Sequence, residues 1–106
     1  MKEISSSEFS QEVVQSEKPV LIDFYADWCG PCRMLSPIVA ELAAERADTL
    51  KVVKVNVDKA SDLAAAFRVQ SIPTLVYFEG GKAKGMSVGY TDKADLERKL
   101  SEWGAS

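Results

Sequence analysis

Three apolar runs along the chain predict the strands of a sheet. Residues 19–26 form a short run rich in β-branched and aromatic side chains, which is typical of a strand buried on both faces. Residues 50–57 predict a second buried strand, because alternate positions carry valines that share one face. Residues 74–88 predict a hairpin, since the Gly-Gly pair within them can adopt the positive φ of a tight turn.

Helical spacing fills the segments between and beyond these strands. The expected helices cover roughly residues 8–16 (capped by the serines at 5–7, with Phe9, Val13 and Val14 inward), the segment after Cys32 (with Leu35, Ile38, Val39 and Leu42 inward), residues 58–67, and a last helix that Thr91 or Asp92 caps. A strand–helix–strand order at this spacing predicts a parallel pair with a right-handed crossover. We therefore expect one α/β domain over residues 1–106, with a mixed sheet and helices on both faces.

The charged residues give no sign of a nucleic-acid or membrane partner. The net charge is −3, with 13 Lys or Arg and 16 Asp or Glu spread along the chain, whereas a phosphate-binding surface needs clustered cations. Each apolar run is far shorter than the roughly 20 residues of a membrane-spanning helix. We expect no nucleic acid and no membrane among the partners, and a cytoplasmic location.

The chain has two cysteines and no histidine. The missing histidine excludes a Ser-His-Asp or Cys-His nucleophile system within this chain. Cys29 and Cys32 supply only half of the four ligands that a tetrahedral zinc site normally needs, so we expect no metal. A metal or iron–sulfur centre shared between two chains is the alternative that remains open.

The run Cys29-Gly30-Pro31-Cys32 lies between a buried strand and a helix, where a reactive thiol is favoured. Free N–H groups and the positive end of the helix dipole stabilise a thiolate there. Residues three apart on a helix share a face, so a small adjustment lets the disulfide close. Gly30 lets a partner chain approach closely, and Pro31 loses no hydrogen bond at a helix start. We expect Cys29 to be the more reactive thiol and Cys32 to be the less exposed one.

The segment from Asp23 to Cys32, Asp-Phe-Tyr-Ala-Asp-Trp-Cys-Gly-Pro-Cys, resembles the active-site segment of the thioredoxin family. Lys54, Ile72-Pro73-Thr74 and Val88-Gly89 also stand where that family places them, so the resemblance covers nearly the whole chain. It implies the thioredoxin fold, a central mixed five-stranded sheet flanked by helices on both faces. Thioredoxins are among the proteins in which the C-x-x-C motif and its lowered thiol pKa are well known.

The resemblance implies that the cysteine pair is the redox-active centre of a general protein-disulfide reductase. Cys29 would attack a disulfide in a target protein, and Cys32 would resolve the mixed disulfide. The pair would need no bound cofactor, because electrons would come from NADPH through a partner thioredoxin reductase. Disulfide-containing proteins are the expected substrates, and a monomer is the expected state.

Asp23 and Lys54 are the candidates for handling the proton of Cys32. Asp23 is the only charge within an apolar strand, so burial should raise its pKa toward that of a useful base; the alternative is a carboxylate that faces solvent. Thioredoxins carry an aspartate at this place. Lys54 could reach Asp23 if their strands are neighbours, as in the family. We expect Lys51 to point to the same face, which makes it a rival candidate, and a lysine that extends to the surface is the other alternative for Lys54.

The resemblance also implies a substrate-binding surface around the first cysteine. Its expected residues are Trp28, Gly30, Pro31, Ile72, Pro73, Val88 and Gly89. Pro73 is similar to the family's cis-proline, which would leave the Ile72 backbone free to bind an extended target segment. We expect Trp28 to be partly exposed.

Two residues depart from the family pattern, and two other functions stay open. Tyr25 stands where many thioredoxins have tryptophan, and Arg33 where lysine is frequent; we expect these changes to affect partner choice and redox poise. The first rival function is a non-enzymatic binding subunit, in which the cysteines would be dispensable. The second is a metal-bridged dimer through the cysteine pair.

Overall fold

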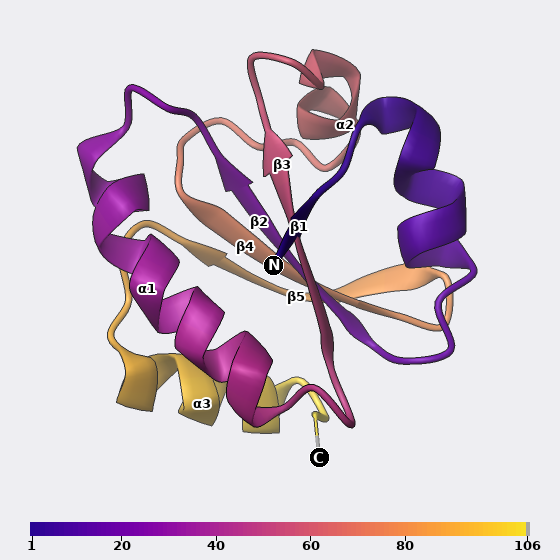
Figure 1. Cartoon of the computed structure of the whole chain (residues 1–106), viewed down its shortest axis with the longest axis vertical. Helices are drawn as coiled ribbons and strands as arrows, with labels where there is room; N and C mark the ends of the chain where they lie inside the picture. The colour runs from indigo at the N-terminus through magenta and orange to yellow at the C-terminus, as the bar shows by residue number, and fades with distance from the viewer. Residues whose placement is uncertain (106) are drawn as a thin grey trace.

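The computed structural model describes residues 1–105, which form one mixed sheet with helices on both faces (Figure 1). In chain order the elements are β1 (Lys2–Glu3), the 3₁₀ turn η1 (Ser6–Glu8), the π-helical turn η2 (Ser10–Val14), β2 (Val20–Tyr25), α1 (Gly30–Glu45), β3 (Lys51–Asn56), α2 (Ser61–Ala66), β4 (Thr74–Glu79), β5 (Lys82–Val88) and α3 (Lys93–Glu102). The predicted α/β class and the strands at 19–26, 50–57 and 74–88 are confirmed, with small differences at their ends.

The five strands lie in the order β1-β3-β2-β4-β5. β2 is parallel to β3 and antiparallel to β4, and β3 is also parallel to β1. The mixed five-stranded sheet that the resemblance implies is therefore present. β2 is the central strand of the sheet. The cysteine motif that follows it therefore begins at the C-terminal end of β2, between the neighbouring strands β3 and β4 (Figure 1).

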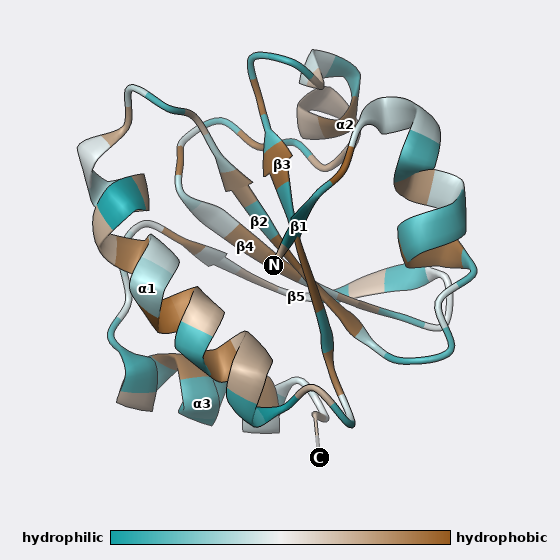
Figure 2. Cartoon of the chain, viewed as in Figure 1, coloured by the Kyte–Doolittle hydropathy of each residue, from teal (hydrophilic) through white to brown (hydrophobic). Residues whose placement is uncertain are grey.

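Each face of the sheet buries its own hydrophobic core. The first core joins α1 and α3 to the sheet through Leu21, Leu35, Val39, Leu42, Leu50, Val52, Leu75, Tyr77, Leu96 and Leu100. The second lies under η2 and α2 and consists of Ile4, Val13, Val20, Ile22, Phe24, Val53, Val55, Ala60, Leu63, Val76 and Phe78. Figure 2 shows how hydrophobic and hydrophilic residues alternate along α1, as expected for a helix with one buried face.

The N-terminal helical segment begins earlier and is less regular than the sequence predicts. It starts at Ser6, where the N–H of Ser5 donates a hydrogen bond of 2.9 Å to the Glu8 carboxylate. Val13 is buried as predicted, but Val14 is 47% exposed, so the prediction that it faces inward is wrong. The physical reason is that 3₁₀ and π turns depart from the period of 3.6 residues on which the prediction rests.

Local turn and cap chemistry fixes the C-terminal third. Gly80 and Gly81 have φ of +62° and +84°, as the hairpin prediction requires. Of the two predicted caps for α3, Asp92 is the residue used, because its carboxylate accepts a hydrogen bond of 2.8 Å from the N–H of Asp95.

Candidate active site

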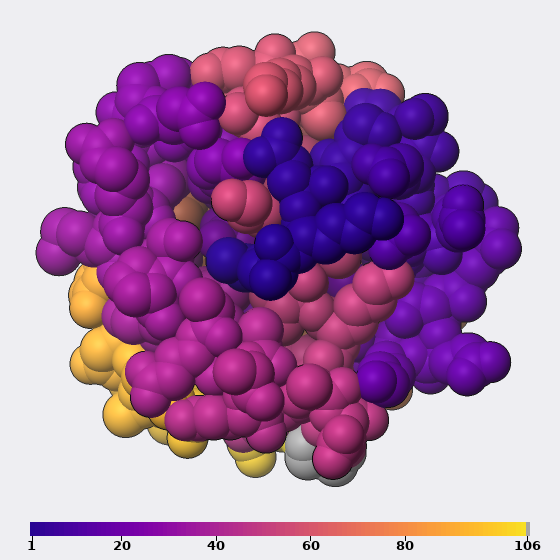
Figure 3. Space-filling model, in the orientation of Figure 1, coloured from indigo at the N-terminus to yellow at the C-terminus, as the bar shows by residue number. Residues whose placement is uncertain are grey.

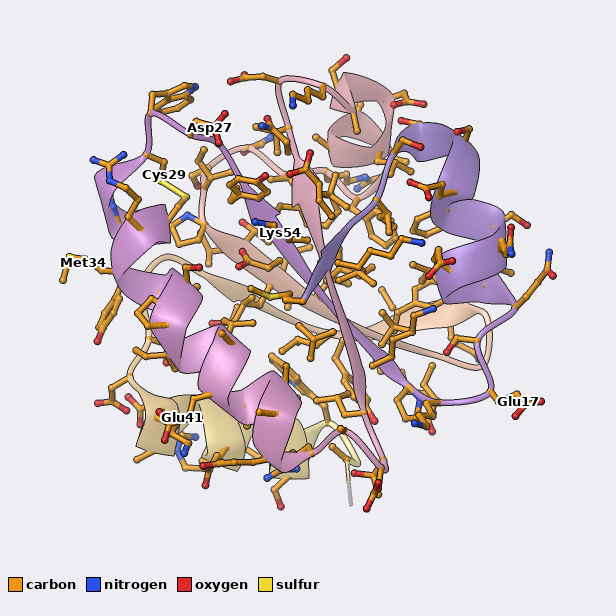
Figure 4. The ribbon with its side chains drawn as sticks, in the orientation of Figure 1. Glu17, Asp27, Cys29, Met34, Glu41 and Lys54 are labelled. Carbon is orange, nitrogen blue, oxygen red and sulfur yellow. A yellow bond between two sulfur atoms is a disulfide. The ribbon has the colours of Figure 1, made fainter. Side chains whose placement is uncertain are left out.

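Cys29 and Cys32 form a disulfide at the junction of β2 and α1. Their Cα atoms are 5.2 Å apart, within the ordinary range for a disulfide. Figure 4 shows the sulfur–sulfur bond beside Asp27, at the opposite end of α1 from Glu41. The two cysteines are equally buried, at 4% and 5% exposed. The prediction that Cys32 is the less exposed one is wrong, because both cysteines belong to one buried cluster with Ala26, against which Ile72 packs.

Cys29 is the N-cap residue of α1, and its Sγ accepts a hydrogen bond of 3.2 Å from the N–H of Cys32. Gly30 and Pro31 occupy the first turn of the helix. The sulfur of Cys29 therefore lies at the positive end of the helix dipole, among N–H groups that lack partners within the helix. When the disulfide is reduced, the same groups favour a thiolate at Cys29.

Asp23 lies buried on β2, with only 3% of its surface exposed. Its Oδ1 has no hydrogen-bond partner among residues 1–105. Burial raises the pKa of Asp23 to about 6, and the positive charge of Lys54 opposes this rise. The alternative of a solvent-facing carboxylate is therefore wrong, and a carboxyl group of this pKa can exchange a proton near neutral pH.

A pocket of about 170 Å³ connects the buried carboxyl with the disulfide. Its lining consists of Asp23, Tyr25, Ala26, Asp27, Cys32, Arg33, Ser36 and Lys54. A water molecule occupies about 30 Å³ in the liquid and needs two to four polar partners, so a pocket of this size and lining has room for water. A proton could pass between Cys32 and Asp23 by way of such water.

Lys54, and not Lys51, is the lysine beside the buried carboxyl. Lys54 lies in register with Asp23 on the neighbouring strand and is half-buried. Lys51 lies on the other face of β3, where its Nζ donates to the Glu12 backbone at 2.8 Å and pairs with the Glu12 carboxylate at 2.9 Å. The prediction that Lys51 points to the same face as Lys54 is wrong, because side chains alternate along a strand and the two lysines are three positions apart.

Trp28 is 68% exposed, as predicted, and its indole N–H donates a hydrogen bond of 2.8 Å to Asp58. Asp58 is absent from the predicted site residues. It lies two residues beyond the end of β3, so the sequence signal for it is that parallel strands β3 and β2 end on the same side of the sheet. An apolar groove of about 390 Å³ runs between Trp28 and Ile72.

The Ile72–Pro73 bond is cis, in agreement with the resemblance. The carbonyl oxygen of Ile72 lies 3.8 Å from Sγ of Cys29. Gly89 donates a hydrogen bond of 2.7 Å to the carbonyl of Pro73, and the neighbouring Val88 is 60% exposed. The predicted binding residues from distant parts of the chain thus meet on one side of the disulfide.

Arg33 turns back onto the loop that precedes the disulfide. Its Nη1 donates a hydrogen bond of 2.8 Å to the backbone carbonyl of Asp27, which ties the first turn of α1 to that loop. Within residues 1–105, no group of three or more His, Cys, Asp or Glu side chains is placed to hold a metal ion. In the same described part of the chain, none of the helices combines the length and apolar character that crossing a membrane requires.

A disulfide at a helix N-terminus, with a buried carboxyl of raised pKa behind it, defines a dithiol–disulfide oxidoreductase. The family model described as Thioredoxin matches residues 1–102. The chain belongs to the thioredoxin family, and the redox-active group of its members is the disulfide itself, without an external cofactor.

Individual relatives support the same assignment. Thioredoxin 1 of Nostoc sp. is 45% identical over 100 residues, which cover 94% of each chain. The thioredoxin of Mycobacterium tuberculosis is 46% identical over 99 residues, covering 93% of this chain and 85% of the relative. A bifunctional thioredoxin reductase/thioredoxin of Mycobacterium leprae is 44% identical over 100 residues, which cover 94% of this chain and 22% of that protein.

Proposed function

We propose that the chain is a general reductant of protein disulfides, in which Cys29 is the nucleophile and Cys32 the resolving thiol. The observation that carries this proposal is the capping position of Cys29, whose sulfur already accepts the N–H of Cys32. That hydrogen bond and the helix dipole stabilise negative charge on one sulfur of the pair.

The proposed reaction is two successive thiol–disulfide exchanges. The Cys29 thiolate attacks one sulfur of a target disulfide, forms a mixed disulfide and releases the first target thiolate. The Cys32 thiolate then attacks Sγ of Cys29, forms the intramolecular disulfide and releases the second target thiolate. The target gains two electrons and two protons, and the cysteine pair loses them.

Asp23 is the proposed acceptor for the proton of Cys32, and Lys54 is proposed to tune its proton affinity. Support comes from the pocket that both share with Cys32 and from the pKa of about 6 that burial gives Asp23. At this pKa the carboxyl is mostly ionised at neutral pH, so it can take up a proton as the resolving thiol is activated.

The proposed docking surface for targets comprises Trp28, Gly30, Pro31, Ile72, Pro73, Val88 and Gly89. It is supported by the exposure of Trp28 and Val88 and by the groove beside Trp28. An extended target segment could pair with the backbone at Ile72, next to Sγ of Cys29. An apolar surface of this kind suits many targets at modest affinity.

The proposed partner for regeneration is a thioredoxin reductase that draws electrons from NADPH. The Mycobacterium leprae relative, whose name joins a thioredoxin reductase to a thioredoxin, supports a partner of this kind. We further propose that the chain acts as a monomer in the cytoplasm.

Trapping of the mixed disulfide tests the proposed roles of the two thiols. Reduced Cys32→Ser protein, incubated with a disulfide-bonded protein such as insulin, should accumulate a covalent adduct that separates on a non-reducing gel. The wild type should turn the same substrate over without adduct, and Cys29→Ser should do neither.

Equal adduct formation by Cys32→Ser and Cys29→Ser would contradict the assignment of the nucleophile. Two further controls address the rival functions. If a Cys29→Ser, Cys32→Ser double variant still performs the protein's role in the cell, the role as a non-enzymatic binding subunit is favoured. Zinc or iron in stoichiometric amounts in the reduced protein, measured by elemental analysis, would favour a metal-bridged dimer.

A further inference from the structure

Three charged residues lie in one row across the sheet, directly behind the disulfide. Glu3 on β1 is in register with Lys54 on β3, and Lys54 is in register with Asp23 on β2. Residues in register on parallel strands point to the same face, so the row reads carboxylate, ammonium, carboxylate. The central ammonium can therefore move toward either carboxylate.

The Tyr25 side chain crosses this row from β2 to β1. Its hydroxyl donates a hydrogen bond to the Glu3 carboxylate, although the two strands are two spacings apart, roughly 10 Å. The ring passes over β3 on the way, and the Lys54 ammonium lies 5.1 Å from the ring centroid. This distance is within the range of a cation–π contact. Burial and the Glu3 carboxylate raise the pKa of Tyr25 well above its ordinary value, so the hydroxyl stays a donor.

The remaining charged groups around the buried carboxyl are few. From α1 and the loop before it, Cys32, Arg33 and Asp27 line the same pocket as Asp23. Arg33 is engaged with the backbone of Asp27. On the β4 side, the residue in register with Asp23 is the uncharged Leu75. Lys54 is therefore the charged group whose position has the main effect on this carboxyl.

We propose that Tyr25 and Glu3 are positioning residues that hold the Lys54 ammonium beside Asp23 and thereby set the proton affinity of the proposed proton acceptor. The tie to the tyrosine hydroxyl occupies the Glu3 carboxylate, whose other oxygen lies 4.0 Å from Nζ of Lys59. Glu3 is thus kept from drawing Lys54 toward β1. This inference deepens the proposed function, because it assigns a control to the acceptor that the function invokes.

The hydrogen bond between Tyr25 and Glu3 connects the N-terminal strand to the active site. β1 has only two residues, yet its Glu3 influences the carboxyl of Asp23, twenty positions further along the chain. Figure 3 shows the N-terminal segment at the surface, next to residues of the α1 region. Tyr25 is also the residue that departs from the tryptophan of many thioredoxins, and an indole lacks the hydroxyl that reaches Glu3.

The titration of Asp23, followed by the ¹³C resonance of its carboxyl carbon in the oxidised protein, tests this inference. Tyr25→Phe removes the hydrogen bond to Glu3 and so frees the Glu3 carboxylate to attract Lys54 away from Asp23. The titration midpoint of Asp23 should therefore rise above that of the wild type. At an effective dielectric constant of about 20, each ångström by which two opposite charges move apart beyond contact distance weakens their attraction by a few tenths of a pKa unit, so we expect a shift of that order. Glu3→Ala removes the competing carboxylate altogether, so Lys54 is not drawn toward β1 and the midpoint should stay at or below that of the wild type.

Tyr77→Phe is the matched control, because it also removes one tyrosine hydroxyl. The hydroxyl of Tyr77 is buried, has no partner among the described residues and does not line the pocket. Its midpoint should equal that of the wild type. A midpoint that stays unchanged in Tyr25→Phe would overturn the inference, and so would a rise of equal size in Glu3→Ala or in Tyr77→Phe.

A separate measurement keeps the inference apart from the proposed function. The rate of mixed-disulfide resolution, measured against pH, should lose its dependence near pH 6 in Asp23→Asn. If that dependence persists, the proposed role of Asp23 as acceptor fails, whereas the titration midpoints still decide whether Tyr25 and Glu3 position Lys54.

Discussion

Replacement of Asp23 by asparagine should stabilise the protein at alkaline pH, although it removes a charged group from the active site. Asp23 is buried, one of its oxygens lacks a partner among residues 1–105, and ionisation therefore places a poorly solvated charge inside the domain. Asparagine has nearly the same shape and carries no charge.

The magnitude follows from the pKa of the carboxyl. Burial raises it from 3.8 to about 6 even with the attraction of Lys54 included. A difference of about 2 units corresponds to about 3 kcal/mol. Between about pH 4 and pH 6 the native state binds more protons than the unfolded state, so the free energy of unfolding falls as the pH rises through this window. Above the window the full cost of the buried charge persists.

Guanidinium unfolding of the oxidised wild type and of Asp23→Asn, at pH 8 and at pH 4, provides the assay. The variant should be more stable by about 3 kcal/mol at pH 8, and the gain should shrink to below about 1 kcal/mol at pH 4, where the native carboxyl is protonated. A gain that is equal at the two pH values would refute the reasoning, because packing or hydrogen bonding of the amide would then explain it.

Three further substitutions test individual contacts. Lys54→Met should raise the pKa of the buried carboxyl above its value of about 6, and a lowered or unchanged NMR titration midpoint would contradict this. Gly85→Ala should lower the free energy of unfolding by about 1–3 kcal/mol, because a Cβ there would overlap the Trp103 indole; a variant as stable as the wild type would show that the indole yields freely. Asp58→Ala should increase the mobility of Trp28, seen as faster decay of its fluorescence anisotropy, while costing less than about 1 kcal/mol in stability since the bond is exposed; unchanged decay would show that packing alone holds the ring.

Local sequence signals predict most of the fold. The strand that ends at Tyr25 and the helix that begins after Cys29 follow from apolar runs and helical spacing, both of which are short-range properties. The turn at Gly80 and Gly81 is likewise predictable, because few residues adopt its positive φ. The prediction is wrong at Val14, where irregular turns replace the regular helical period.

Contacts between distant segments limit what the sequence predicts about the site. Alternation along the strand separates Lys51 from Lys54, but the pairing of Lys54 with Asp23 depends on the register of β3 against β2. The equal burial of the two cysteines depends on the side chains that cover them. The link between Tyr25 and Glu3 requires a two-residue strand to pair with β3, and a strand so short leaves no periodic pattern in the sequence.

The reduction potential of the Cys29–Cys32 pair tests the central claim most directly. It is measured by equilibrating the protein in graded thiol–disulfide buffers and quantifying the oxidised fraction. A reductant of protein disulfides should have a potential at or below about −260 mV, the reducing end of the cytosolic glutathione poise measured by extraction; thioredoxin is one of the proteins for which such potentials are established. A value near −120 mV, as in strongly oxidising pairs, would contradict the claim that this chain is a reductant of protein disulfides.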